Sequence, residues 1–255
     1  MKRIDLLPLA LLVPVIAFVA VQAAQTPRIT VATGGAVAAR GTISQEVETP
    51  DSVATEAPAD LGGPNPDAAD VRRRLQQGEH GTYIGEILRQ RDSALARWPE
   101  RVGQPVRVWI APGNGMKDWD PAFGLRVHDA FDEWSGLGIP VRFIFVVDSS
   151  DADVHVVWID HFKEPISGKT LWARDRRWWI VDGNITLALH HNGGEALDTR
   201  AVQAIALHEV GHLLGLDHTS DTTNIMTPRV RVRDLSEADR ATMRLLYTLP
   251  AGSVK

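Results

Sequence analysis

Near the C-terminal end of the 255-residue chain the sequence reads His208-Glu209-Val210-Gly211-His212-Leu213-Leu214-Gly215-Leu216-Asp217-His218, with the spacing H-E-x-x-H-x-x-G-x-x-H. The first two histidines are four residues apart. On an α-helix they therefore point in nearly the same direction, one turn apart. Two imidazoles on one helical face can ligate a single zinc ion. The spacing thus predicts a metal-binding helix that contains His208 and His212.

The remaining positions of the stretch predict an open metal site. Glu209 is rotated by roughly 100° from His208, so it is poorly placed as a ligand but can contact a bound water. Gly215 can take the left-handed conformation at no steric cost, which ends the helix and turns the chain back. His218 then becomes the third ligand. Three protein ligands leave a fourth position for water, which is typical of a catalytic zinc.

A family resemblance rests on this stretch and on the segment after it, Thr219-Ser220-Asp221-Thr222-Thr223-Asn224-Ile225-Met226-Thr227-Pro228. Together they resemble the metzincin zinc metalloproteases and, within them, the matrixins (peptidase M10). The resemblance implies an α+β, zincin-like catalytic domain. Its twisted, mostly parallel five-stranded sheet would pack against long helices, one of which carries the zinc ligands. It also implies that Met226 forms the Met-turn beneath the three imidazoles and is not a ligand.

The activity implied by the resemblance is that of a zinc metalloendopeptidase with one catalytic zinc ion, acting on polypeptides. Zinc would lower the pKa of its bound water, and Glu209 would take the proton and pass it to the leaving amine. Pro228 would line the pocket for the substrate side chain after the cut bond. Proteases of this type hold extended substrates against the edge of a sheet. We expect one strand to form this edge, and the alternative is that the same strand is an ordinary buried one. The strand comprises Ile185, Thr186, Leu187, Ala188 and Leu189.

Composition narrows the possibilities further. The chain has nine histidines and no cysteine. Disulfides, thiolate zinc sites and the cysteine-based latency of many matrixins are therefore excluded. A net charge of −5 gives no general attraction to nucleic acid. Many matrixins bind a second, structural zinc in the stretch that corresponds to residues 160–184. This stretch contains a single histidine, His161, so we expect no structural zinc, while calcium binding stays open. We expect a monomer.

The alternative to a zinc endopeptidase is a zinc-binding module without turnover. The intact Glu209 favours the enzyme.

The N-terminal third predicts export. Residues 1–24 begin with Lys2 and Arg3, continue with an apolar run and end with small residues near Ala23. This pattern is typical of a secretory signal peptide, with an uncleaved membrane anchor as the alternative. Either places the protein outside the cytoplasm, secreted or anchored. Residues 25–70, without aromatic residues, read as a disordered linker or a propeptide. Residues 71–250 would form the metalloprotease domain, with its core from about residue 104.

The order of elements follows from hydrophobic spacing and turn residues. Helices are expected over 71–98, after Asp120-Pro121, from Asp198 or Thr199 to about Leu214, and from Ser236 to Tyr247. Strands are expected over 106–110, 141–147, 154–159 and 169–173, followed by a hairpin of 178–181 and 185–189 around Asp182-Gly183-Asn184. Gly211 inside the zinc helix predicts close packing against the loop that carries Met226.

Overall fold

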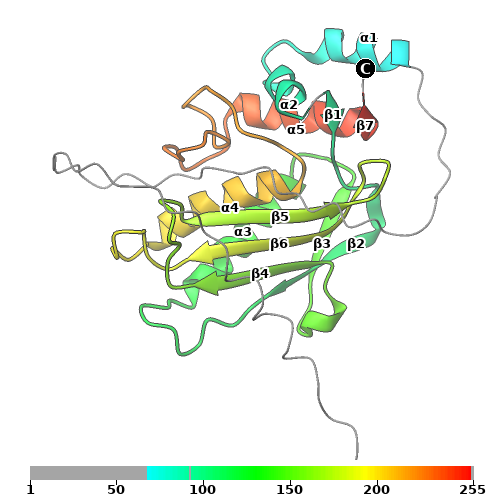
Figure 1. Cartoon of the computed structure of the whole chain (residues 1–255). Helices are drawn as coiled ribbons and strands as arrows, with labels where there is room; N and C mark the ends of the chain where they lie inside the picture. The colour runs from blue at the N-terminus through cyan, green and yellow to red at the C-terminus, as the bar shows by residue number, and fades with distance from the viewer. Residues whose placement is uncertain (1–67, 92, 254–255) are drawn as a thin grey trace, which may run out of the picture. The chain divides into compact units, whose positions relative to one another are not determined.

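A five-stranded sheet forms the centre of the computed structural model, which describes residues 68–91 and 93–253 (Figure 1). Its strands lie in the order β3-β2-β4-β6-β5. They are β2 (Arg101–Ile110), β3 (Val141–Phe145), β4 (Val154–Ile159), β5 (Gly168–Arg174) and β6 (Ile180–Ala188). Only β5 runs antiparallel to its neighbour. The predicted α+β fold with a mostly parallel sheet is confirmed.

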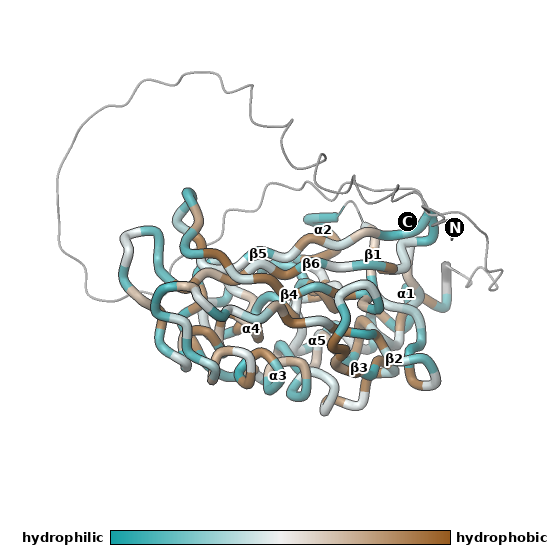
Figure 2. The backbone as a smooth tube through the Cα atoms, turned by 90° about the horizontal axis from the view of Figure 1, so that it is seen from below, coloured by the Kyte–Doolittle hydropathy of each residue, from teal (hydrophilic) through white to brown (hydrophobic). Residues whose placement is uncertain are grey.

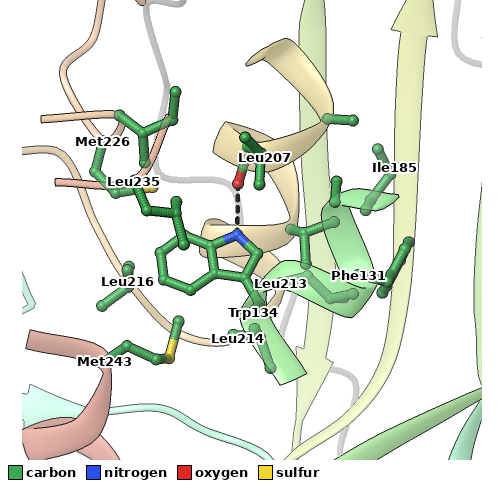
Figure 3. Packing of buried hydrophobic residues seen from close by; sticks show 14 of the residues in the cluster. Phe131, Trp134, Ile185, Leu207, Leu213, Leu214, Leu216, Met226, Leu235 and Met243 are labelled. Carbon is green, nitrogen blue, oxygen red and sulfur yellow. Dashed lines mark hydrogen bonds between the residues drawn. The ribbon is translucent and has the colours of Figure 1, made fainter. Parts of the chain in front are cut away.

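Two long helices, α3 (Ala122–Ser135) and α4 (Thr199–Leu213), pack against each other and against the sheet. Figure 2 shows both on one side of β4, β5 and β6. The indole N–H of Trp134 in α3 donates a 2.8 Å hydrogen bond to the carbonyl of Leu207 in α4, deep in the core (Figure 3). A bulky side chain thus joins the helices without leaving a buried donor unpaired.

The ends of these helices follow the predictions closely. Asp198 caps α4 and accepts a hydrogen bond from the N–H of Ala201, as one of the two expected caps. At α3 the expected cap is wrong by one position. Pro121 is the N-cap residue, and the Asp120 carboxylate accepts the N–H of Ala122. The carboxylate still satisfies a free donor of the first turn.

The single helix expected over 71–98 is wrong. That region contains α1 (Ala68–Gly78), α2 (Ile84–Gln90) and β1 (Ala94–Leu95). Gly81 and Ser93 have φ angles of +75° and +64°, which a right-handed helix cannot contain. The predicted boundary at residue 70 falls inside α1. The predictions for residues 1–24 and 25–67 lie outside the described residues.

The C-terminal elements pack beside this N-terminal segment. β7 (Gly252–Ser253) pairs with β1, and α2 contacts α5 (Glu237–Thr248), as Figure 1 shows. Ser236 and Asp239 form a reciprocal capping box at the start of α5, which confirms the predicted start. Within the described part of the chain, no helix is long and apolar enough to cross a bilayer.

The hairpin predicted around residues 182–184 is also wrong. β6 is continuous there, and the turn to β5 lies at residues 175–179. The Asp175 carboxylate makes this turn by accepting the N–H groups of Arg177 and Trp179. Gly183 has a different purpose, since a Cβ atom there would collide with the side chain of Leu213 in α4. The glycine lets helix and sheet approach closely.

Candidate metal centre

Three imidazoles converge at the C-terminal end of α4. The Nε2 atoms of His208 and His212 are 3.0 Å apart, and that of His218 lies 3.2 Å from His212 and 3.3 Å from His208. Nitrogen ligands about 2.0–2.1 Å from a tetrahedral zinc ion are roughly 3.3 Å from one another. The separations therefore fit one zinc ion. Among the described residues, the ring nitrogens of His208, His212 and His218 are the set of side-chain ligand atoms close enough to share one metal ion.

The protonation of two rings supports metal binding. His208 Nδ1 lies 2.7 Å from the carbonyl of Ile225, and His212 Nδ1 lies 3.1 Å from that of Leu216. A carbonyl only accepts, so each Nδ1 carries the proton and each Nε2 keeps a lone pair. Burial, together with the two neighbouring imidazoles, holds the pKa of His208 well below its ordinary value. The ring is therefore neutral, the form that binds metals.

Gly215 makes the turn that brings in the third imidazole. Its φ angle is +103°, in the left-handed region, and a Cβ atom there would collide with the carbonyl oxygen of Ala96. Both observations require glycine at this position. The chain reverses after α4, and His218 reaches the other two rings, as predicted.

Glu209 lies beside the imidazoles on the adjacent face of α4. Its side chain is buried, and the hydroxyl of Thr170 in β5 lies 2.7 Å from its Oε2 atom and 2.9 Å from its carbonyl oxygen. Gly168 in β5 leaves room for the carboxylate, since a Cβ atom there would collide with Oε1. Glu209 thus lies against the first residues of β5. A pocket at this point is lined by Ser167, Gly168, Ile205, His208, Glu209, Pro228 and Val230.

Met226 is fully buried in the loop that follows the third histidine. Its sulfur lies where a side chain of Gly211 would be, so the predicted close packing of this glycine is confirmed. The Met226 carbonyl accepts the N–H of Thr219, which ties the two ends of the loop together. Its role as a floor beneath the imidazoles stays a prediction.

The structure contradicts the prediction that residues 185–189 form the outer edge of the sheet, where a substrate could pair. Ile185, Thr186, Leu187 and Ala188 belong to β6, which pairs with β4 on one side and β5 on the other. The N–H of Leu189 donates to the carbonyls of Ile159 and Asp160. These backbone groups are therefore already used within the sheet. The reason is that β5 returns antiparallel and takes the outer position, beside Glu209.

Sequence reasoning missed three residues that support the site. Thr170 and Gly168 contact the Glu209 carboxylate, and no local pattern marks them. Asp239 is fully buried and accepts the N–H groups of Ile225 and Ser236 and the hydroxyl of Tyr83. The spacing Ser-x-x-Asp at the start of α5 is a signal that could have identified it.

The chain is similar to one family of known proteins, over a region that contains this site. The family model of the matrixins (peptidase M10) matches residues 121–248. Metalloendoproteinase 1-MMP of Arabidopsis thaliana is 32% identical over 139 residues, which are 46% of this chain and 36% of the relative. Metalloendoproteinase 1 of Glycine max is 31% identical over 149 residues, 50% of this chain and 46% of the relative.

The longest of these matches is to metalloendoproteinase 2-MMP of Arabidopsis thaliana, 35% identical over 212 residues. It covers 72% of this chain and 53% of the relative. The chain thus spans between 36% and 53% of the length of these three relatives. The region that the family model matches runs from α3 to the end of α5 and includes α4, whereas α1, α2, β1 and β2 lie upstream of it.

Proposed function

Because the chain belongs to the matrixin family, we propose that it is a zinc-dependent endopeptidase that hydrolyses peptide bonds in polypeptides. One observation supports this most directly. Three imidazole Nε2 atoms converge to within 3.0–3.3 Å of one another, and the Glu209 carboxylate and His208 line the same pocket. A purely structural zinc site is closed by four protein ligands. Here three ligands and a neighbouring carboxylate fit a hydrolytic site.

When held by the three Nε2 atoms, zinc supplies Lewis acidity, which activates water and polarises a carbonyl group. Glu209 accepts a proton from the attacking water and delivers it to the leaving amine. Thr170 holds one carboxylate oxygen of Glu209 at 2.7 Å, so the base is oriented before substrate arrives. The carbonyls of Ile225 and Leu216 keep the rings of His208 and His212 in the orientation and tautomer that ligation needs.

The substrate would lie along β5. This strand is outermost in the described sheet and begins at Gly168, beside the Glu209 carboxylate. An extended peptide added to such an edge gains backbone hydrogen bonds that do not depend on its sequence. Pro228 and Val230 line the same pocket as Gly168 and would supply an apolar wall for one substrate side chain. We therefore move the proposed pairing strand from residues 185–189 to β5.

Location, metal content and assembly belong to the same proposal. Residues 1–24 carry the pattern of a signal peptide or membrane anchor, so the protein would act outside the cytoplasm. A monomer with one catalytic zinc is expected. Bound calcium is a separate prediction, and the measurement of metal content that detects zinc also detects calcium.

The decisive experiment compares the purified protein with its Glu209→Ala variant. Metal content is measured by mass spectrometry, and cleavage of an unfolded protein is measured with and without a chelator. We expect the wild type to bind one zinc and to cleave. The variant should bind zinc equally well and lose about 10²- to 10⁴-fold in kcat. A peptide library then gives the side-chain preference.

Two outcomes would contradict the proposal. Full turnover by Glu209→Ala would remove the carboxylate from the mechanism. Zinc binding without cleavage of the library by the wild type would favour a zinc-binding module without turnover.

A further inference from the structure

Helix α2 contacts the loop that carries the third histidine. α2 comprises only Ile84–Gln90, and it lies upstream of the region that the family model matches. The loop comprises residues 215–220, more than 120 residues further along the chain. Side chains from α2 and from the residue after it, Arg91, reach the backbone or side chain of all six loop residues. The loop is therefore held from outside the metal centre.

Arg91 makes the largest set of these contacts. Its Nη1 and Nη2 atoms donate to the carbonyls of Gly215 and Leu216, at 3.0 and 3.2 Å. Its Nε atom lies 2.6 Å from the Asp217 carboxylate, and both side chains are largely buried. The guanidinium also lies over the ring of Trp172 in β5, 5.1 Å from its centroid. A planar fork with five donors is suited to such a set of contacts, and an ammonium group is not.

One acceptor links Arg91 to the second metal ligand. The Leu216 carbonyl accepts from Arg91 Nη2 and also from His212 Nδ1, the bond that fixes the tautomer of that ring. The Asp217 carboxylate that pairs with Arg91 also lies 3.3 Å from the N–H of His218. Arg91 therefore acts on two of the three ligands, each through one intervening group.

Glu86 and Gln90 hold the other half of the loop. The two carboxylate oxygens of Glu86 accept the hydroxyl of Thr219, at 3.1 Å, and the N–H of Ser220, at 2.8 Å. The Gln90 side chain donates to the carbonyl of His218 itself, at 3.1 Å. The third ligand therefore has a contact from α2 on its own backbone and further contacts on both sides.

The helix itself is firmly attached to the core. Ile84 and Ile87 are buried, and the hydroxyl of Tyr83, the N-cap residue, donates to the buried Asp239 in α5. The N–H of Tyr83 donates to the hydroxyl of Thr242 in the same helix. A short helix anchored in this way can hold a loop in one position, because its own movement would break buried contacts.

We propose that residues 83–91 form a positioning element of the metal site. This element fixes the loop that carries the third ligand, His218, and Arg91 is its main residue. The inference rests on the proposed zinc site and adds residues that touch neither metal nor substrate. It extends the functional unit upstream of residue 121 to Tyr83. Residues 83–91 are therefore part of the active protein.

The test measures zinc affinity in Arg91→Gln, Arg91→Lys and Glu86→Gln by competition with a chromophoric chelator. Loss of such an outer contact typically weakens metal binding about 10- to 100-fold. We expect that weakening for Arg91→Gln and a smaller one for Arg91→Lys, which keeps the charge beside Asp217. Arg89→Gln removes the same charge from the exposed side of α2 and should bind zinc as the wild type does.

A second measurement separates positioning from general stability. Thermal unfolding of each variant is followed with and without zinc, and the cobalt-substituted proteins are compared by their visible spectra. Positioning predicts that the zinc-induced rise in Tm shrinks and that the cobalt spectrum changes. If Arg91→Gln lowers the Tm of the metal-free protein but keeps wild-type zinc affinity and spectrum, the inference is overturned. If the wild type binds no zinc, the proposed function fails first.

Discussion

Gly211 in α4 has no side chain at the point where the sulfur of Met226 lies against the helix. A Cβ atom there would also lie 3.2 Å from Cζ2 of Trp134, which is fixed by its hydrogen bond to Leu207. Figure 3 shows Met226 and Trp134 in the same buried cluster. The zinc helix and the loop after it therefore meet at a glycine that lies between the two metal ligands of α4.

Replacement of Gly211 with alanine should destabilise the protein, although alanine is the better helix former. Met226 is fully buried and has little space to move away, so overpacking should cost about 1–3 kcal/mol. Gly124→Ala in α3 is the matched control, because a Cβ atom there meets nothing within 4 Å. It should stabilise the protein by about 0.5–1 kcal/mol. Urea unfolding measures both, and equal effects of the two changes would contradict the packing argument.

How much of this site could be read from the sequence depends on how local each feature is. The ligand spacing, the helix cap and the turn at Gly215 each depend on residues close together in the sequence. The spacing and the turn were predicted, and Asp198 was one of the two caps expected. Gly183 was misread, because a glycine that permits close approach to Leu213 looks the same as one in a turn. A sequence pattern does not distinguish these uses.

The identity of the edge strand depends on more distant pairing. Residues 185–189 have the apolar pattern of a strand, but only the position of β5 decides whether that strand is outermost. The contacts of Arg91 with residues 215–217 join segments more than 120 positions apart. Neither relationship leaves a periodic signal, so both needed the structure.

Replacement of Gly168 with alanine should reduce turnover and also stability, because the new Cβ atom would lie 2.7 Å from Cγ2 of the buried Ile205 as well as against Glu209. The new Cβ atom would collide with Oε1 of Glu209, and that carboxylate is the mobile end of a flexible side chain. The carboxylate would move away, and a displaced catalytic group can cost on the order of 10²-fold in kcat. Zinc binding should be kept. Gly103→Ala in β2, where a Cβ atom meets nothing within 4 Å, is the control and should keep full activity. Normal kcat in Gly168→Ala would show that Glu209 tolerates the shift.

Asp239 joins α5, the loop before Met226 and the start of α2, so its replacement should affect all three. Alanine would leave the N–H groups of Ile225 and Ser236 and the hydroxyl of Tyr83 without their buried acceptor. A loss of about 2–5 kcal/mol in unfolding free energy is expected. Asparagine can still accept the two N–H groups and donate to the Tyr83 oxygen, so it should cost only about 1 kcal/mol. Similar losses for both variants would mean that the charge matters more than the hydrogen bonds.

His190 should make stability depend on pH. Its buried ring lies between two exposed carboxylates, with Nε2 2.9 Å from Asp118 and Nδ1 2.9 Å from Asp160. The hydrogen bond to Asp118 raises the pKa of His190, and the same bond lowers the pKa of Asp118. The Asp160 pKa is lowered mainly by its hydrogen bond with His161. Lys117 also lies beside Asp118.

The direction of each shift defines the pH range. A raised histidine pKa adds stability that is complete below its unfolded value of about 6.5 and is lost as pH rises through the folded value. The lowered carboxylate pKa values add stability above about 3.9 that is lost as pH falls through their folded values. The cluster should therefore stabilise the protein most between about pH 4 and 6.5.

Unfolding free energies of the wild type and of His190→Gln, measured at pH 5.5, 7.5 and 9 on metal-free protein, should differ most at the lowest pH. Because the variant keeps the neighbouring carboxylates and the zinc ligands, the difference isolates His190. A difference that stays constant or grows towards pH 9 would show that the ring is neutral in the folded protein.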